Sequence, residues 1–499
     1  MASPETLSPS SAETVEVPPE RRVSGLRSLV GDSAVYGIGV AAAPLALLLG
    51  TPIIARSLGP LGFGAIDVLT AVITVFGLVA LLGMDSAGVR SFYDYRPDQA
   101  LQRRLVIRTA IAIVTISALT IAIALLLTLL AIEIVVSHSS FQTIEATIAA
   151  LVVMPLITVQ TISREAFRFD RRRGTYVIAG VLQGLGGVLA AVILVKAGFG
   201  GTGFFLGLGV GATIGLLFAL AFGRFLVTER PSTDRHEARR MLRYGLPLVP
   251  ASVAIWVVFA VDRTLLVSMK GFFQAGLYGL ASKASAPLVM AISAFSLAWG
   301  PFIMSQAPER HAELRARALT AATAASASIC LCVIVFERQI VSILGGPNFE
   351  LSTRAVPGIA LGWVGWSAAV VLATEFAISR RTLVIAAMTG VAAAVNVVLN
   401  LILIPPFGYI GAAWTSAVSF FFLAGLYWWW EQRSGAAPYR WWRLATIALV
   451  LGTLVPLAVS QEQTIQLWAQ VAICAVGVTV LTFVAVTDRS REGLRGAHA

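Results

Sequence analysis

The sequence predicts an all-α integral membrane protein with about 14 transmembrane helices. Of its 499 residues, 57% are hydrophobic and only 13% are charged, and the mean hydropathy is +0.82. A soluble fold cannot bury so much apolar surface. The apolar residues form runs of about 20 separated by short polar breaks, and basic residues recur in alternate breaks. These three observations indicate that lipid is the main solvent of the chain.

The apolar runs define the expected helices one by one. A helix needs about 20 predominantly apolar residues to cross the hydrocarbon core of a bilayer, and its backbone groups are then all hydrogen-bonded internally. Runs of this kind occupy residues 34–56, 65–84, 108–136, 142–163, 176–197, 204–226, 246–268, 278–305, 317–336, 355–377, 382–404, 409–430, 443–460 and 465–486.

The basic residues orient these helices. With the N-terminus in the cytoplasm, 30 of the 37 lysines and arginines fall in cytoplasmic segments. One missed or invented helix would scramble this alternation in every later loop. The net charge of +11 is thus spread between membrane spans, which argues against nucleic-acid binding and for contact with membrane lipids. Both termini are expected in the cytoplasm.

Polar segments flank the predicted membrane region. Residues 1–33 begin with a stretch rich in Ser, Pro and Glu, and no apolar segment precedes Arg21 and Arg22. We therefore expect a disordered cytosolic tail there and not a cleaved signal. Residues 488–499 are predicted to form a second cytosolic tail.

An internal repeat divides the helices into two groups. Two of its matches join similar segments at offsets of 207 and 208 residues, and the third joins glycine pairs at an offset of 212. The matches are Thr175-Tyr-Val-Ile-Ala179 with Thr382-Leu-Val-Ile-Ala386, Phe199-Gly-x-x-Gly203 with Phe407-Gly-x-x-Gly411, and Gly59 and Gly64 with Gly271 and Gly276.

The repeat predicts two six-helix bundles, over residues 34–230 and 240–432, with two extra C-terminal helices in residues 440–487. Because six is an even number, the second bundle repeats the orientation of the first. This arrangement implies a pseudo-two-fold axis along the membrane normal and a substrate path between the bundles. The alternative is that apolar helices share composition and glycine turns by chance.

Five stretches of the second half of the chain have a familiar pattern. They are Tyr244-Gly-Leu-Pro-Leu-Val-Pro250, Asp262-Arg-Thr-Leu-Leu266, Gly276-Leu-Tyr-Gly-Leu-Ala281, Asn396-Val-Val-Leu-Asn-Leu-Ile-Leu-Ile-Pro405 and Gly411-Ala-Ala413. These stretches resemble bacterial polysaccharide flippases of the multidrug, oligosaccharidyl-lipid and polysaccharide exporter superfamily. The resemblance covers the first 12 expected helices in layout and is sharpest from Tyr244 to Ala413.

The resemblance implies a carrier in the bacterial cytoplasmic (inner) membrane. Such a protein moves undecaprenyl-diphosphate-linked oligosaccharide repeat units to the outer leaflet by alternating access, with ion coupling. It serves the biosynthesis of surface polysaccharide, either lipopolysaccharide or exopolysaccharide. The implied partners are the lipid-linked oligosaccharide, membrane lipids, a polysaccharide polymerase and glycosyltransferases.

Charged side chains within the spans are the first candidates for a binding site. Each costs about 2.5 to 3.5 kcal/mol or more at the bilayer centre, so it usually faces a cavity or a partner. Arg56, Arg263 and Lys283 lie in helices that the family places around the central cavity, and they could bind the diphosphate. Arginine offers a bidentate fork and lysine a point charge. For Arg56, snorkelling to the outer interface is the alternative.

Two carboxylates are candidates for ion coupling. Asp262 precedes Arg263 directly, and helix neighbours point about 100° apart, so we expect Asp262 to pair across helices with Lys283 or Arg56. A carboxylate that loses its cation when substrate arrives could take a proton or sodium ion, and Asp67 is the second candidate. A purely structural ion pair is the alternative.

Asn396 and Asn400 lie four residues apart on one helix face. They suit either the hydroxyls of a sugar substrate or a hydrogen bond between helices.

Catalytic chemistry is not expected. An integral-membrane glycosyltransferase or polymerase usually needs an extended loop or domain, and no loop here greatly exceeds 20 residues. Cys330 and Cys332 share one apolar run and Cys474 lies in another, so neither a disulfide framework, a metal site nor a cofactor is predicted. Within transport, a multidrug or toxin exporter and a peptidoglycan-precursor flippase of the same superfamily remain alternatives.

Overall fold

A computed structural model describes residues 20–96, 98–136, 141–170, 172–223, 235–379, 381–434, 438–460 and 467–486, and within them no strand occurs. The all-α membrane fold is thereby confirmed. The α-helices are α1 Glu20–Leu81, α2 Met84–Asp94, α3 Ala100–Val136, α4 Phe141–Phe169, α5 Arg173–Leu194, α6 Gly200–Phe222, α7 Arg235–Gly245, α8 Val249–Ala284, α9 Ala286–Met304, α10 His311–Val335, α11 Glu337–Gly345, α12 Val356–Ile378, α13 Thr382–Ser434, α14 Trp441–Ser460 and α15 Leu467–Val486. Short π and 3₁₀ segments are η1 Val195–Phe199, η2 Leu246–Leu248, η3 Pro308–Arg310 and η4 Pro347–Ala355.

Among the described residues, 11 helical segments are long and apolar enough to cross a membrane. Three of them run for 50 to 53 residues, Ala42–Asp94, Arg173–Phe222 and Leu383–Arg433. Since one crossing takes about 20 residues, each of the three has length for two. Each also turns at a glycine with positive φ, namely Gly59, Gly198 or Gly408. The count of 14 crossings stays a prediction.

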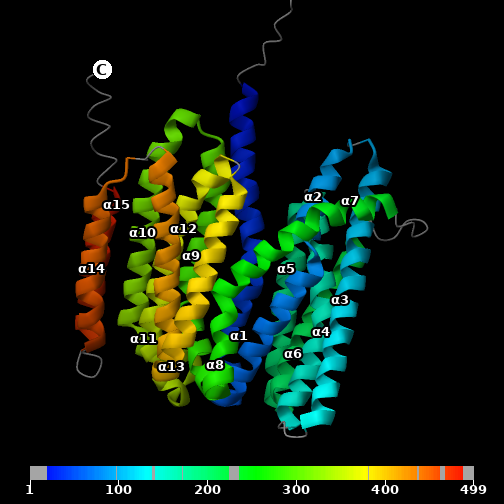
Figure 1. The fold of residues 1–499 in the computed structure, drawn as a ribbon, viewed down its shortest axis with the longest axis horizontal. Coiled ribbons are helices and arrows are strands. Elements are labelled where there is room, and N and C mark those ends of the chain that lie inside the picture. Colours follow the sequence, from blue (N-terminus) through cyan, green and yellow to red (C-terminus); the bar gives the residue numbers. More distant parts are fainter. Residues whose placement is uncertain are drawn as a thin grey trace, which may run out of the picture.

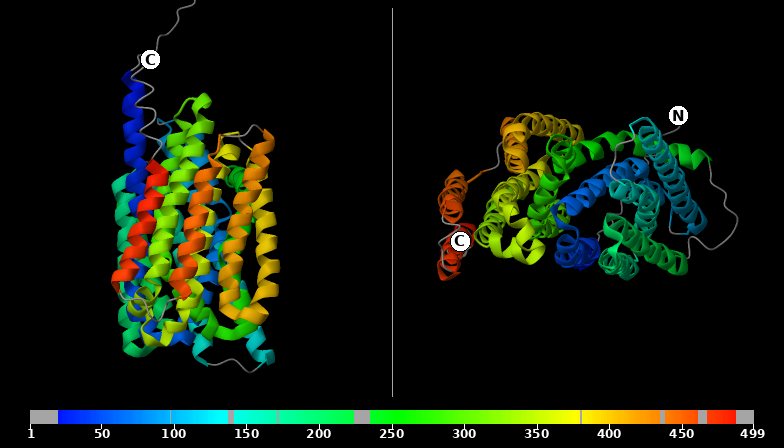
Figure 2. Two further views of the ribbon diagram at one scale, coloured as in Figure 1. Left: turned by 90° about the vertical axis from the view of Figure 1, so that its left-hand side faces the viewer. Right: turned by 90° about the horizontal axis from the view of Figure 1, so that it is seen from below.

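The helices gather into two bundles, as Figure 1 shows. Helices α1 to α6 form the first bundle, and α8 to α13 form the second. The two bundles meet where α1 packs along α8. Helices α14 and α15 pack against α10 at the far edge of the second bundle, away from the first (Figure 2).

The molecule has two ends, which differ in structure. We call the end that carries α2 and α7, uppermost in Figure 1, the linker end. The opposite end, where α1 and α8 turn at Gly59 and Gly271, is the hairpin end. Which end faces the cytoplasm stays a prediction.

Helix α7 was not foreseen from the sequence because it is short and strongly charged. It docks on α2 at the linker end, where Glu237 accepts a hydrogen bond from Tyr95 at 3.1 Å and Arg240 pairs with Asp94 of α2 at 3.4 Å. Backbones touch as well: a methyl group added at Gly245 would lie 2.3 Å from the carbonyl oxygen of Leu82. The connection between the bundles is therefore tied to the first bundle.

The expected N-terminal tail needs one correction. Helix α1 begins at Glu20, so residues 20–33 are helical and the prediction of disorder is wrong for them. The stretch rich in Ser, Pro and Glu that suggested disorder is residues 1–19, which lie outside the described residues, as do residues 488–499.

At the hairpin end the two bundles touch through glycine. A methyl group added at Gly64 would lie 1.9 Å from the carbonyl oxygen of Phe272, and one at Gly276 would lie 1.8 Å from that of Pro60. The two contacts are reciprocal, since Gly64 and Gly276, like Pro60 and Phe272, differ by the same 212 residues. Reciprocal contacts of this kind are what a two-fold axis produces.

A buried ionic network secures the linker end of the second bundle. Arg315 of α10 contacts Glu375 of α12 at 2.5 Å and Glu431 of α13 at 3.0 Å. The hydroxyl of Tyr439 donates to the other oxygen of Glu431. Burial and this hydrogen bond raise the pKa of Tyr439 well above its ordinary value, so the hydroxyl stays protonated and remains a donor.

Candidate functional site

A cavity of about 630 Å³ lies between the two bundles. This volume is within the range of about 300 to 1,000 Å³ that ligand pockets occupy. Its walls come from α1, α4, α5 and α6 of the first bundle and from α8, α9, α12 and α13 of the second. The cavity lies between the bundles, where the repeat predicts a substrate path, and its use as that path stays a prediction.

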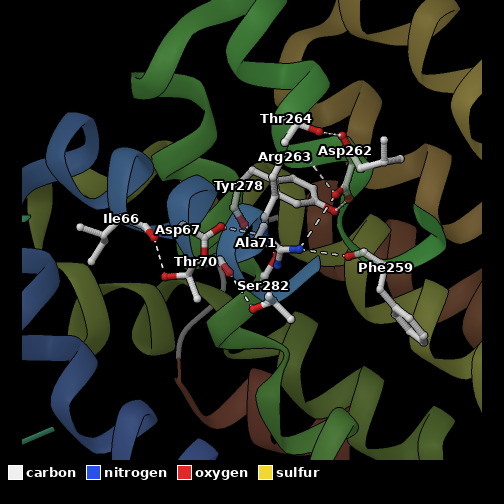
Figure 3. A network of polar contacts seen from close by, with 12 residues as sticks. Ile66, Asp67, Thr70, Ala71, Phe259, Asp262, Arg263, Thr264, Tyr278 and Ser282 are labelled. Atoms are coloured by element: carbon white, nitrogen blue, oxygen red, sulfur yellow. Dashed lines mark hydrogen bonds and ion pairs between the residues drawn. The ribbon is translucent and has the colours of Figure 1, made fainter. Parts of the chain in front are cut away.

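An ion pair, drawn in Figure 3, joins the two bundles at Arg263, which lines this cavity. Nε of Arg263 in α8 contacts Oδ2 of Asp67 in α1 at 2.7 Å, although the two residues are 196 apart in sequence. Arg263 also donates to the backbone carbonyl of Phe259 at 3.0 Å. Its side chain is 19% exposed and that of Asp67 is 9% exposed. Two of the predicted site residues are thus brought together.

Asp262 faces a different set of partners. Its Oδ2 accepts hydrogen bonds from the hydroxyl of Tyr278 and, at 3.3 Å, from Ser416. Its Oδ1 accepts from the backbone N–H of Arg263 at 2.9 Å. The expected pairing of Asp262 with Lys283 or Arg56 is wrong. Because helix neighbours diverge by about 100°, Arg263 points to α1 while Asp262 points to α13.

Lys283 lines the cavity from the far end of α8. No hydrogen bond or ion pair to its ammonium group occurs in the part of the chain that the structure describes. Asp67 is the carboxylate whose charge acts on Lys283, but it is already paired with Arg263. Lys283 is therefore the cation of this site that is available to an anion.

Arg56 lies outside the cavity lining. Its guanidinium donates to the carbonyls of Ser342 at 3.0 Å and Ile343 at 2.8 Å, in the last turn of α11. Cations near a helix C-terminus satisfy free carbonyls and interact favourably with the helix dipole. Neither the sequence nor its hydropathy had indicated α11, so this role was not foreseen. A substrate contact by Arg56 stays a prediction that its position does not favour.

The two asparagines are likewise away from the cavity. Both are buried in α13, where Asn396 donates to Ser419 at 3.1 Å and Asn400 donates to Asn396 at 3.1 Å. Ser419 lies beyond the turn at Gly408, so this chain of bonds joins the two halves of α13. The sequence left open whether these asparagines contact a sugar or join helices, and the geometry favours a hydrogen bond between helices.

Sequence reasoning missed Tyr278 and Ser416, the partners of Asp262. Both also line the cavity. A signal existed for Tyr278, which stands in the stretch 276–281 that carries the family resemblance. Ser416 had no signal, because a serine in an apolar helix usually bonds its own backbone.

Three comparisons place this fold among known proteins. A family model described as a polysaccharide biosynthesis protein matches residues 29–306, more than half of the chain. No curated protein matches the chain by sequence. A solved structure titled as the lipid II flippase MurJ in an inward closed conformation has a TM-score of 0.69 at 13% identity, covering 93% of this chain and 99% of its own.

Two further solved structures share the fold. An inward-facing multidrug resistance MATE family transporter of the MOP superfamily has a TM-score of 0.63 at 15% identity, covering 81% of this chain and 98% of its own. A MOP superfamily transporter from Pyrococcus furiosus has a TM-score of 0.56 at 15% identity, covering 82% of this chain and 96% of its own. These neighbours are transporters and a flippase, not enzymes. At such identities they show the fold alone.

Proposed function

This chain belongs to the polysaccharide biosynthesis protein family, and from that premise we propose that it carries lipid-linked oligosaccharide across a membrane. The cargo is an undecaprenyl-diphosphate-linked repeat unit, moved from the cytoplasmic to the outer leaflet of a bacterial inner membrane by alternating access. The proposed partners are glycosyltransferases before this step and a surface polysaccharide polymerase after it.

One observation carries the proposal: a cavity between two bundles presents a lysine that has no partner among the described residues, beside a paired arginine. A buried cation that lacks a carboxylate is costly, and an anionic ligand offsets the cost. A diphosphate offers two centres of negative charge. Lys283 suits one of them as a point charge, and Arg263 suits the other through its fork of donors.

The same contacts support ion coupling. When a phosphate group bonds to Arg263, it competes with Asp67 for the guanidinium that joins α8 to α1. Asp67 would then be an unpaired carboxylate within the membrane, where a charge without a partner is costly. Uptake of a proton or a sodium ion by Asp67 removes that cost. Asp262 is the second proposed ion site, because Tyr278 and Ser416 supply it with oxygen neighbours.

A peptidoglycan-precursor flippase is the second candidate. The structure titled as a lipid II flippase covers 93% of this chain, whereas the MATE transporters cover 81 to 86%. This difference favours a lipid-linked cargo over a drug, but it does not separate one lipid-linked cargo from another.

The proposal is tested by reconstituting the protein in liposomes and following the transfer of undecaprenyl diphosphate linked to a hexose between leaflets. Lys283→Gln should lower the transfer rate about tenfold or more, because a hydrogen bond to a charged group contributes about 1.5 to 3 kcal/mol. Lys270→Gln is the matched control. Lys270 is exposed on the same helix and outside the cavity lining, so its loss should leave the rate within about twofold.

Equal effects of the two substitutions would contradict the diphosphate assignment. Failure of the wild-type protein to move any lipid-linked sugar, with efflux of cationic drugs instead, would sink the proposed function and favour the exporter. Faster transfer of lipid II than of the hexose-bearing lipid would favour the second candidate.

A further inference from the structure

The two walls of the cavity differ in chemistry. The first bundle contributes four threonines, two on α1 and two on α4: Thr70, Thr74, Thr158 and Thr161. Within each helix the pair is three or four residues apart and therefore shares a face. Gln183 of α5 extends this wall, and its amide oxygen has no hydrogen-bond partner among the described residues.

All four threonine hydroxyls offer the cavity the same hydrogen-bonding capacity. Each donates its hydrogen to the backbone carbonyl four residues earlier, at 2.6 to 2.8 Å. A hydroxyl has one hydrogen and two lone pairs, so these oxygens remain as acceptors only. The wall of the first bundle is thus rich in acceptors, and a ligand that suits it must bring hydrogen-bond donors.

A glycine lies beside one of these hydroxyls. A methyl group added at Gly77 of α1 would lie 3.3 Å from Oγ1 of Thr158, with no other atom within 4 Å. Both residues line the cavity. Thr158 is 4% exposed, so a methyl group at Gly77 would close the narrow approach that remains to its hydroxyl.

The opposite wall carries cations and aromatic rings. Arg263 and Lys283 supply the positive charge. One helical turn from Arg263, Phe259 stacks on Trp363 with centroids 5.6 Å apart, and Phe420 lies 5.4 Å from Phe259. All three rings line the cavity and offer flat apolar surface with a negative π face.

We propose that the threonine wall is a saccharide subsite that faces the aromatic rings across the cavity, distinct from the cations that bind the diphosphate. A sugar ring matches both walls, because its rim carries hydroxyl donors and its faces carry C–H groups. The subsite selects for the sugar-bearing form of the cargo. This inference rests on the proposed function, since it assigns the second part of the same ligand.

The test compares two probes on the protein in nanodiscs, undecaprenyl diphosphate and undecaprenyl diphosphate linked to a hexose. The Thr158→Val, Thr161→Val double variant keeps the shape of both side chains and removes both hydroxyls. It should weaken binding of the hexose-bearing lipid about tenfold, as the loss of one or two hydrogen bonds does, and leave the sugar-free lipid within about twofold.

Gly77→Ala is an independent variant, because it covers the hydroxyl of Thr158 without removing it. It should show the same selective loss. Thr120→Val is the matched control: Thr120 makes the same bond to the carbonyl four residues earlier, at 2.8 Å, but is exposed on α3 outside the cavity lining. It should bind both probes like the wild type.

The outcomes separate this inference from the proposed function. Equal weakening of both probes by the double variant, or no effect on either, overturns the saccharide subsite. Lys283→Gln should weaken both probes, which is the signature of the diphosphate site. If the wild-type protein binds neither lipid, the proposed function itself fails, and the subsite fails with it.

Discussion

At the scale of single residues, the site depends on how two adjacent charges are partnered. Asp262 and Arg263 follow one another in α8, yet the first is held by Tyr278 and the second by Asp67. The two side chains contact each other only at 4.0 Å. The two charges are therefore satisfied by different partners, and of these contacts the Arg263–Asp67 pair is the one that joins the two bundles.

Breaking this pair should reveal a coupling between distant residues. We expect Asp67→Asn and Arg263→Gln each to destabilise the protein. The double variant should lose less stability than the two single variants lose together. Because Asp262 stays near Arg263 and the pair is partly exposed, the expected coupling energy is about 1 to 3 kcal/mol, below the largest values for buried pairs. Thermal unfolding in detergent micelles measures it. Strictly additive effects would show that the contact contributes nothing.

At the scale of helices, ionic groups hold α10, α12 and α13 together near the linker end. Arg315 is 5% exposed and touches two carboxylates, of which Glu431 is almost fully buried. Tyr439, in the segment before α14, completes the shell of Glu431. The network fixes how these helices pack, and it lies apart from the cavity, since none of its members lines it.

Arg315→Met should therefore destabilise the fold without a direct effect on binding. It leaves Glu431 buried without a cation, which costs about 3 to 5 kcal/mol. Arg317→Met is the control on the same helix, where the pair with Glu313 is near the surface and contributes about 0 to 1 kcal/mol. Melting temperatures of the two purified variants decide the matter. A loss for Arg317→Met as large as that for Arg315→Met would refute a special role for the buried network.

At the scale of the whole molecule, the hairpin end is closed by two glycines that occupy equivalent places in the two bundles. Helix backbones approach this closely only where side chains are absent, as in other tightly packed membrane helices. The symmetry does not extend to charge. At the same offset of 212 residues, the partner of Asp67 is Gly279, where a methyl group would lie 2.9 Å from Oδ2 of Asp67.

Gly64→Ala and Gly276→Ala should each favour opening of the hairpin end, and to a similar degree. In both cases a methyl group would lie less than 2 Å from a carbonyl oxygen of the other bundle, so the bundles must separate. Distances between spin labels on the two bundles, measured at the hairpin end, should lengthen or broaden. Gly390→Ala is the control, because a methyl group there meets nothing within 4 Å. Unchanged distances in both variants would contradict the proposed closure.

Much of the fold followed from local properties of the chain. Apolar runs are long enough to span a bilayer whatever surrounds them, so the membrane class and most helix positions could be predicted. The repeat was visible because turns at Gly59 and Gly271 need a backbone conformation that glycine adopts readily. The short charged helices α2, α7 and α11 escaped prediction, because hydropathy gives no signal for helices that do not cross the membrane.

The sequence by itself determined the solvent of this protein, its helical architecture and the charged residues that its predicted spans contain. Only the tertiary structure decided how those charges are used. Arg263 and Lys283 line the cavity, Arg56 caps α11, and Asn396 bonds across the turn of α13. The physical reason is that sequence fixes the angle between residues on one helix, whereas the rotation of each helix in the bundle is set by packing against its neighbours.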